Sequence, residues 1–278
     1  MHDIDMDGRT VLQLADVVKV FSRGTVDEVT ALNHVNISVY ESDFITIIGS
    51  NGAGKSTLLN IIAGVYPPER GGKVYIRGND VTNLAEHRRA GYVGRVWQEP
   101  QMGTSGGLTI EENMSLAFLR RQRKGLGWAV TKMRRDLFRE RLSLLGLGLE
   151  DRLSVSTGTL SGGQRQALAL VMATIGKPTI LLLDEHVASL DPKTAKTVLS
   201  MTDDIVRADE VTAVVVTHNM DVALRHGNRL IMMHEGRIIL DIGEAKKKVL
   251  SVEDLVRAFE QAAGETFDDD SVLLTQRE

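Results

Sequence analysis

The sequence predicts an α/β fold with a mostly parallel sheet, and two features of the 278-residue chain point to it. First, the short apolar run at residues 44–48 passes through a glycine-rich loop into the apolar segment 58–63, the strand–loop–helix order of a buried parallel strand. Second, strand-like and helix-like segments alternate between residues 179 and 225. Strands that alternate with helices form a parallel sheet covered on both faces.

The first half of the chain predicts a second, antiparallel layer and a helical insertion. Residues 11–21 and 35–40 alternate between apolar and polar side chains, as strands of a partly exposed layer do. Residues 73–77 and 92–97 are further predicted strands. Between about residues 103 and 158, segments 110–121 and 130–145 have helical periodicity, and glycine clusters flank the stretch.

Alternation resumes after the insertion. We predict helices over residues 165–175, 192–207 and 220–225, and strands over 179–183 and 211–217. Residues 229–234 and 237–241 predict a hairpin that turns at Glu235-Gly236. Residues 251–262 form the last predicted helix, and the acidic end from about residue 264 is expected to be loose.

Composition excludes several classes of protein. A net charge of −4 gives no basic field, so no nucleic-acid partner is predicted. The absence of cysteine excludes disulfides and thiol chemistry and suits a reducing cytoplasm. No stretch approaches the roughly 20 apolar residues of a membrane span, and the acidic N-terminus is no secretory signal. The basic run 246–248 is expected to be a solvated helix face.

The most specific motif is the loop after residue 48, which fits G-x-x-x-x-G-K-[ST] at every position. Its backbone N–H groups and the following helix N-terminus make an anion site, where Lys55 reaches the β- and γ-phosphates and the Ser56 hydroxyl binds Mg²⁺. A glycine-rich turn that binds nothing is the alternative, which Gly-Lys-Ser in this setting disfavours. The predicted nucleotide-binding residues are Gly49, Ser50, Asn51, Gly52, Ala53, Gly54, Lys55, Ser56 and Thr57.

Two adjacent carboxylates end the predicted strand 179–183. In phosphate-loop proteins an Asp at such a strand end holds the Mg²⁺ that bridges the phosphates, and Asp184 has that position. A cation on Asp184 would leave Glu185 available as the base for the attacking water. The alternative is a polar strand end that caps the next turn.

The run Leu160-Ser161-Gly162-Gly163-Gln164 narrows the class. Ser161 and Gln164 fit a capping box, but capping does not require two glycines, which weaken a helix. Two glycines at a helix start have no side chains in the way, so the backbone there can contact a phosphate. With these motifs in order, the chain resembles the ATP-binding cassette (ABC) ATPases, whose signature is LSGGQ, from about residue 12 to residue 240.

The resemblance implies a P-loop NTPase fold: a RecA-like, mostly parallel sheet core, an N-terminal antiparallel β layer and an inserted α-helical subdomain. It predicts one ABC domain over residues 9–250, in which 9–101 and 166–250 form the core and 102–165 form the helical subdomain with the signature. Residues 251–278 would be a C-terminal helix and an acidic tail.

The resemblance also assigns roles to single residues. Gln98 matches the glutamine that contacts Mg²⁺ and water, although a solvated loop glutamine is the plain alternative. Asp191 matches the D-loop and is also a good helix N-cap before Pro192. His218 matches the switch histidine on the γ-phosphate. Phe21 would stack on adenine or belong to the core. His186 departs from the family, in which many members have proline.

The family mechanism gives the expected function. Lys55, Gln98, Glu185 and His218 hydrolyse ATP with Mg²⁺ on Ser56, Gln98 and Asp184. A second copy of the cassette binds head to tail, so that Ser161, Gly162, Gly163 and Gln164 act on the partner's ATP. Expected partners are integral-membrane permease subunits and an extracytoplasmic substrate-binding protein, with the cassette on the cytoplasmic face of the cell membrane.

The surroundings of Gln98 and Glu185 are most similar to bacterial uptake cassettes, some of them linked to tryptophan or other aromatic amino acids. A soluble ABC ATPase of the DNA-repair or translation type is the alternative. It would carry long coiled-coil insertions or two cassettes in one chain, and neither is visible. A GTPase or small-molecule kinase is disfavoured, since the Asn-Lys-x-Asp guanine motif is absent and LSGGQ has no role there.

Overall fold

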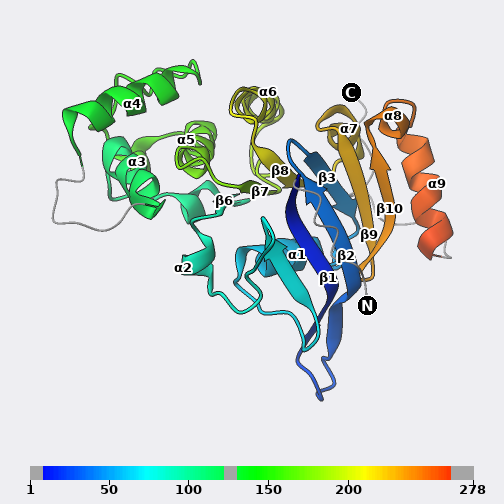
Figure 1. The fold of residues 1–278 in the computed structure, drawn as a ribbon. Coiled ribbons are helices and arrows are strands. Elements are labelled where there is room, and N and C mark those ends of the chain that lie inside the picture. The colour runs from blue at the N-terminus through cyan, green and yellow to red at the C-terminus, as the bar shows by residue number, and fades with distance from the viewer. Residues whose placement is uncertain (1–8, 122–129, 264–278) are drawn as a thin grey trace. The chain divides into compact units, whose positions relative to one another are not determined.

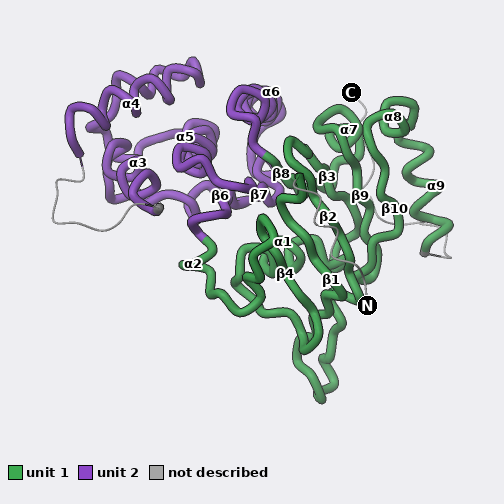
Figure 2. Tube along the Cα trace, in the orientation of Figure 1, with its two compact units in different colours: residues 1–89, 212–278 green, residues 90–211 purple. Residues whose placement is uncertain are grey.

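The computed structural model describes residues 9–121 and 130–263, and the chain divides into two compact units. Unit 1 comprises residues 1–89 and 212–278, and unit 2 comprises residues 90–211 (Figure 2, green and purple). The sequence instead grouped residues 166–250 with the core, and that domain division stays a prediction. Among the described residues, no helix is both long and apolar enough to cross a membrane.

Unit 1 contains an antiparallel sheet in the order β2-β1-β4-β5 (Figure 1). Its strands are β1 (Thr10–Phe21), β2 (Val29–Tyr40), β4 (Lys73–Ile76) and β5 (Asn79–Asp80). The predicted antiparallel layer is therefore confirmed. Strand β2 begins at Val29, six residues before its predicted start, because the long partner β1 supplies hydrogen-bonding groups as far as Phe21.

Unit 1 also holds the parallel strands that the sequence predicted. Strand β3 (Phe44–Gly49) pairs in parallel with both β8 (Thr212–Val216) and β9 (Arg229–His234). All six residues of β3 are buried, as expected for a central strand. Strand β10 (Arg237–Gly243) completes the predicted hairpin, whose turn residues Glu235 and Gly236 both have positive φ.

The helices of unit 1 are short except at the C-terminus. They are α1 (Lys55–Ala63), α2 (Glu86–Arg89), α7 (Met220–Arg225), α8 (Glu244–Lys247) and α9 (Val252–Ala263). Helix α9 buries Leu255 and Phe259 in an apolar cluster with Met220 of α7 and Met232 of β9. The last predicted helix is thus confirmed, and the acidic tail lies outside the described residues.

The position of Lys247 differs from what the sequence predicted. The basic run 246–248 was predicted to be solvated, yet Lys247 is buried and its ammonium group donates to Thr46 Oγ1 and to the carbonyl oxygens of His226 and Gly227. Oxygen acceptors compensate the burial of an ammonium group. Only the fold reveals this, because those acceptors come from distant parts of the chain.

Unit 2 is mainly helical around two strands. Strands β6 (Val93–Val96) and β7 (Ile180–Asp184) pair in parallel. The helices are α3 (Ile110–Phe118), α4 (Lys132–Ser143), α5 (Gly162–Thr174) and α6 (Pro192–Ala208), with 3₁₀ turns η1 (Pro100–Gly103), η2 (Leu119–Arg121) and η3 (Thr157–Thr159). The helical segments predicted over residues 110–121 and 130–145 are confirmed by α3 and α4. The predicted helix 110–121 ends at Phe118 and continues as a 3₁₀ turn.

Candidate nucleotide site

The phosphate-loop motif lies where strand β3 ends and helix α1 begins, in unit 1. Gly49 has a φ of 153° and Gly54 a φ of 95°. A Cβ at Gly49 would lie 2.2 Å from the Met233 carbonyl oxygen, and one at Gly54 would lie 2.2 Å from that of Ala31. Neither position has room for a side chain, so the loop can curl this tightly only with glycine at both.

Lys55 lies inside the curl of this loop. Its buried ammonium group donates to the carbonyl oxygens of Gly49, at 2.7 Å, and of Ser50, at 2.9 Å. Helix α1 has no side-chain cap at Gly54 and no acidic residue in its first turn, and Ser56 is exposed there. A helix start with backbone N–H groups, a lysine and a hydroxyl but no carboxylate has the chemistry of a phosphate site.

The other end of α1 is fixed by Arg89, a residue that sequence reasoning missed. Arg89 is 1% exposed, and its burial lowers the pKa of the guanidinium group. A cation at the C-terminal end of a helix is favourable for its orphan carbonyls. The guanidinium donates to the carbonyl oxygens of Ile61, Ile62, Thr82 and Leu84.

His218 lies at the same edge of the parallel strands as the phosphate loop. In the β3–β8 ladder Ile47 is opposite Val216, and Thr217 N–H donates to the Ile47 carbonyl oxygen at 3.0 Å. Strands that run in parallel end at the same edge, so His218 follows β8 beside the point where Gly49 ends β3. The structure thus brings together two predicted parts of the site, and the contact of His218 with a γ-phosphate stays a prediction.

Phe21 lies at the last position of β1 and makes an aromatic pair that the sequence did not predict. Its ring centroid is 5.3 Å from that of Tyr66, edge to face, and Lys19 Nζ lies 5.4 Å from the Phe21 centroid. Stacking on adenine stays a prediction, and Tyr66 is a second aromatic ring beside it. No motif marks Tyr66 in the sequence.

In unit 2 the parallel pair β6–β7 brings Gln98 to the same strand edge as Asp184 and Glu185. Val96 is opposite Leu183 in the ladder, and Gln98 is exposed just beyond it. Ser189 Oγ lies 3.4 Å from the Gln98 carbonyl oxygen, to which it donates. The three polar residues therefore share one edge of unit 2.

Glu185 has an unusual backbone conformation, with φ at 44°. A non-glycine residue in the left-handed region is strained, and such strain persists where the surrounding structure enforces it, often at functional sites. The turn that follows is closed by a 2.9 Å hydrogen bond from Ala188 N–H to the Glu185 carbonyl oxygen.

His186, the residue after Glu185, is buried and contacts helix α6. Its Nε2 lies 3.1 Å from Thr202 Oγ1, and that hydroxyl donates to the Val198 carbonyl oxygen at 2.8 Å. Because the hydroxyl has a single proton, Nε2–H of His186 is the donor to Thr202. The histidine that replaces the usual proline thus ties the end of β7 to α6.

The signature segment forms the capping box that the sequence predicted. Gln164 N–H donates to Ser161 Oγ, and Ser161 N–H donates to Gln164 Oε1, both at 3.2 Å. The two glycines differ: a Cβ at Gly163 would lie 2.2 Å from Thr194 Cγ2, whereas the nearest neighbour of one at Gly162 is 3.5 Å away. Packing against α6 therefore explains Gly163, and no such packing explains the exposed Gly162.

Asp191 caps helix α6 as predicted, with Pro192 at the first helical position. Thr194 N–H donates to Asp191 Oδ1 at 3.1 Å. Hydrogen bonds from Thr194 lower the pKa of the Asp191 carboxyl group. The cap is exposed, so it leaves the predicted D-loop role open.

Each unit, taken by itself, contains an oxygen donor of the kind that Mg²⁺ prefers. Among the residues that the structure describes, no group of three or more His, Cys, Asp or Glu could hold a metal by itself. Mg²⁺ is usually bound by one or two protein oxygens together with substrate phosphates and water. The Asp184 carboxylate and the Ser56 hydroxyl are hard oxygen donors of that kind.

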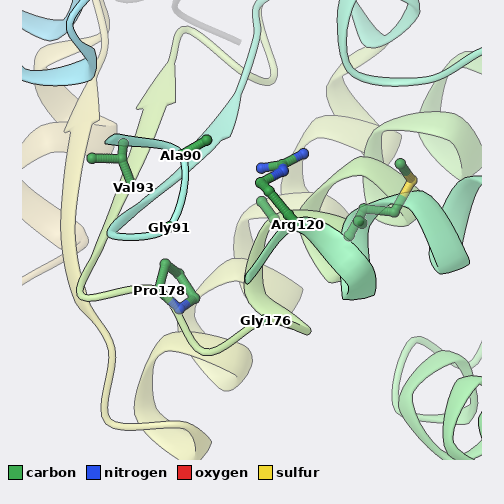
Figure 3. A pocket seen from close by; sticks show the side chains of 9 residues that line it. Ala90, Gly91, Val93, Arg120, Gly176 and Pro178 are labelled. Atoms are coloured by element: carbon green, nitrogen blue, oxygen red, sulfur yellow. The ribbon is translucent and has the colours of Figure 1, made fainter. Parts of the chain in front are cut away.

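Unit 2 also contains a small pocket (Figure 3). It is lined by residues such as Ala90 and Gly91, before β6, and Gly176 and Pro178, before β7. Because β6 and β7 are parallel, this is the opposite edge of the strand pair from Gln98 and the carboxylates. None of the predicted site residues lines it.

The phosphate loop, the strand that ends in two carboxylates and the signature helix together define the class of protein. Residues 32–188 match the family model described as ABC transporter, and the chain belongs to that family. The chain is an ABC transporter ATP-binding subunit that binds and hydrolyses ATP. The predicted α/β fold with a parallel core is confirmed by the solved ABC cassettes that resemble it.

The relatives agree on this class. A tyrosine transport ATP-binding protein of Clostridioides difficile is 40% identical over 91% of this chain and 100% of its own length. A phosphonates import ATP-binding protein of Pseudomonas syringae is 31% identical over 91% of this chain and 90% of its own. A solved dimeric ATP-binding cassette with ADP and phosphate is 31% identical, covers 84% of this chain and 98% of its own, and has a TM-score of 0.71.

Proposed function

We propose that this chain powers a bacterial ABC importer by ATP-driven dimerisation of two copies, and that its cargo is an aromatic amino acid such as tyrosine. The observation that carries the proposal is the 40% identity to a tyrosine transport ATP-binding protein over that relative's whole length. The phosphonates relative, at 31%, is named for import, which supports the direction proposed here. No observation favours the soluble alternative, which remains an outcome of the test.

In the proposed reaction, Gly49–Thr57 holds the phosphates, Lys55 and His218 contact the γ-phosphate, and Glu185 takes a proton from the attacking water. Mg²⁺ on Ser56, Gln98 and Asp184 would offset the negative charge of the phosphates. The folded-back position of Lys55, 2.7 Å from the Gly49 carbonyl oxygen, supports this, because the ammonium group is already directed into the loop.

The dimer is proposed because Gly162 has no packing partner that requires glycine. In a head-to-tail pair, the start of α5, where Ser161 and Gly162 are exposed, would contact the ATP held by the partner's phosphate loop. The dimeric solved relative with ADP and phosphate supports such an assembly.

The remaining partners follow from the importer assignment. Permease subunits would supply the membrane spans and place the cassette at the cytoplasmic face of the cell membrane. A substrate-binding protein outside the membrane would deliver the cargo. The permease and the binding protein select that cargo, so the identity of the transported molecule rests on the relative and not on any residue of this chain.

Two experiments test the proposal. The tagged Glu185→Gln chain is purified from its native membrane with ATP, with the Lys55→Ala chain as control; a multi-span permease should accompany the first. Recovery from the soluble fraction with ribosomal or DNA-bound partners would favour the alternative. Uptake of labelled tyrosine, tryptophan and phenylalanine should fall when the gene is deleted, and loss of phosphonate uptake alone would overturn the cargo assignment.

A further inference from the structure

Arg95 lies against the predicted metal ligand Asp184 inside unit 2. In the parallel β6–β7 ladder Arg95 is opposite Leu182, so its side chain shares a face with Asp184, two residues further along β7. Arg95 Nη2 is 3.7 Å from Asp184 Oδ2. The Arg95 side chain is 8% exposed and that of Asp184 is 15% exposed, so solvent screens this ion pair only weakly.

The guanidinium group is held in place by an aromatic ring. Its central carbon lies 3.5 Å from the centroid of Trp97, the next residue on the same face. Arginine stacks on indole in this way through cation–π attraction. The backbone next to this ring is fixed as well, since Gln166 Nε2 donates to the Trp97 carbonyl oxygen at 3.0 Å. Arg95 therefore presents a fixed positive charge to Asp184.

We propose that Arg95 is a positioning residue that acts as the resident counter-ion of Asp184 and thereby sets the Mg²⁺ concentration at which the site binds metal and nucleotide. This rests on the proposed function, in which Asp184 is a metal ligand. A magnesium ion that binds Asp184 meets a carboxylate already neutralised in part by Arg95 and is repelled by the same guanidinium. Removing that charge should strengthen metal binding about three- to tenfold, the change that corresponds to about 1 kcal/mol of repulsion between two positive charges.

The test is nucleotide binding by the full chain as Mg²⁺ is varied, measured with a fluorescent, non-hydrolysable ATP analogue so that turnover plays no part. In Arg95→Gln the half-saturating Mg²⁺ concentration should fall about three- to tenfold. Arg95→Lys keeps a positive charge but loses the planar stacking on Trp97, so it should lower the Mg²⁺ requirement clearly less than Arg95→Gln does. An unchanged or higher Mg²⁺ requirement in Arg95→Gln, or an equal shift in Arg95→Lys, would overturn the proposal.

A matched control separates this effect from a loss of structure. Arg141 of α4 makes an ion pair of similar exposure within the same unit, with Nη1 2.8 Å from Asp209 Oδ1. Arg141→Gln should leave the Mg²⁺ requirement unchanged even where it lowers the melting temperature, and a shift equal to that of Arg95→Gln would count against a local charge effect. If Arg95→Gln fails to fold, two variants that keep the positive charge, Arg95→Lys and Trp97→Phe, are measured in its place. A three- to tenfold fall of the half-saturating Mg²⁺ concentration in either of them would overturn the proposal.

Asp184→Asn distinguishes this proposal from the function on which it rests. If Asp184 is a metal ligand, Asp184→Asn should lose most of the Mg²⁺ dependence of nucleotide binding. If Asp184→Asn keeps the native dependence, the ligand assignment fails, whatever Arg95→Gln does. If Asp184→Asn loses the dependence and Arg95→Gln does not change it, the counter-ion proposal alone fails.

Discussion

Helices α1 and α5 are both proposed to meet phosphates with their N-termini, yet the two ends are built in opposite ways. The start of α1, at Gly54, has no side-chain cap, and Lys55 fills the adjoining loop. The start of α5 carries a complete capping box between Ser161 and Gln164. An uncapped end leaves its N–H groups for a ligand, whereas a capped end is formed before any ligand arrives.

This difference suggests a division of labour. The uncapped start of α1 would bind the nucleotide of its own chain, and the preformed start of α5 would present Gly162 to the nucleotide of a partner. Changes at α1 should therefore weaken nucleotide binding itself. Changes at α5 should leave binding intact and affect either stability or dimerisation, depending on which of the two glycines is altered.

The largest effect is expected at α1. Lys55→Ala should reduce ATP turnover about 100- to 1,000-fold, because it removes a donor to the charge that develops on the phosphates. Nucleotide affinity, measured by fluorescence titration, should fall as well. Lys73→Ala, which breaks the exposed pair with Asp80 in the same unit, serves as control and should change neither. Native affinity in Lys55→Ala would remove α1 from the proposed site.

Gly163→Ala should destabilise the chain by about 1–3 kcal/mol in urea unfolding, because the new methyl group overlaps Thr194 Cγ2. Threonine is stiff about χ1 and cannot turn away cheaply. Thr194→Ser removes that methyl group, so the double variant should recover most of the loss. Gly162→Ala should leave unfolding nearly unchanged and reduce turnover. Equal destabilisation by both alanines would contradict the packing account.

Ser161→Ala should cost about 1 kcal/mol of unfolding free energy, the usual value of a lost N-cap. Nucleotide binding by the isolated chain should not change, since α5 is not part of its own phosphate site in this account. Calorimetric unfolding and titration with the nucleotide analogue measure the two quantities. Weaker binding in Ser161→Ala would mean that α5 contacts the nucleotide of its own chain.

The smallest expected effect is a difference in pH dependence between the stability that the Asp191 N-cap contributes and the stability that the Ser161 N-cap contributes. Hydrogen bonds from Thr194 lower the folded-state pKa of Asp191, whose ordinary value is 3.8. A lowered carboxyl pKa adds stability above the ordinary value, and that stability is lost as pH falls through the folded-state value. The stability difference between the native chain and Asp191→Ala should therefore shrink below about pH 4. The difference for Ser161→Ala, whose cap does not titrate, should not follow this course.

Local patterns predicted the fold class and most of the site. The glycine spacing of the phosphate loop, the capping box at Ser161 and the Asp191-Pro192 helix start each depend on a few consecutive residues, and the structure has all three local conformations. The signature glycines were only partly understood: the sequence assigned both to phosphate contact, whereas Gly163 packs on Thr194, a residue 31 positions away.

What the sequence did not predict depends on contacts between distant residues. Arg89 and Lys247 stand in basic runs that look solvated, and only the fold places carbonyl oxygens around them. Arg95 meets Asp184 because two strands far apart in sequence pair in one register. The positive φ of Glu185 likewise has no signal in its residue type, since glutamate seldom adopts it.

The most direct test of the account is the mass of the Glu185→Gln chain by light scattering, with and without ATP. The account predicts the 30.5 kDa monomer without ATP and twice that mass with it. Adding Gly162→Asp should abolish the dimer while ATP binding persists, because the signature contacts only the partner's nucleotide. A dimer that persists in the double variant, or a Glu185→Gln chain that stays monomeric with ATP, would contradict it.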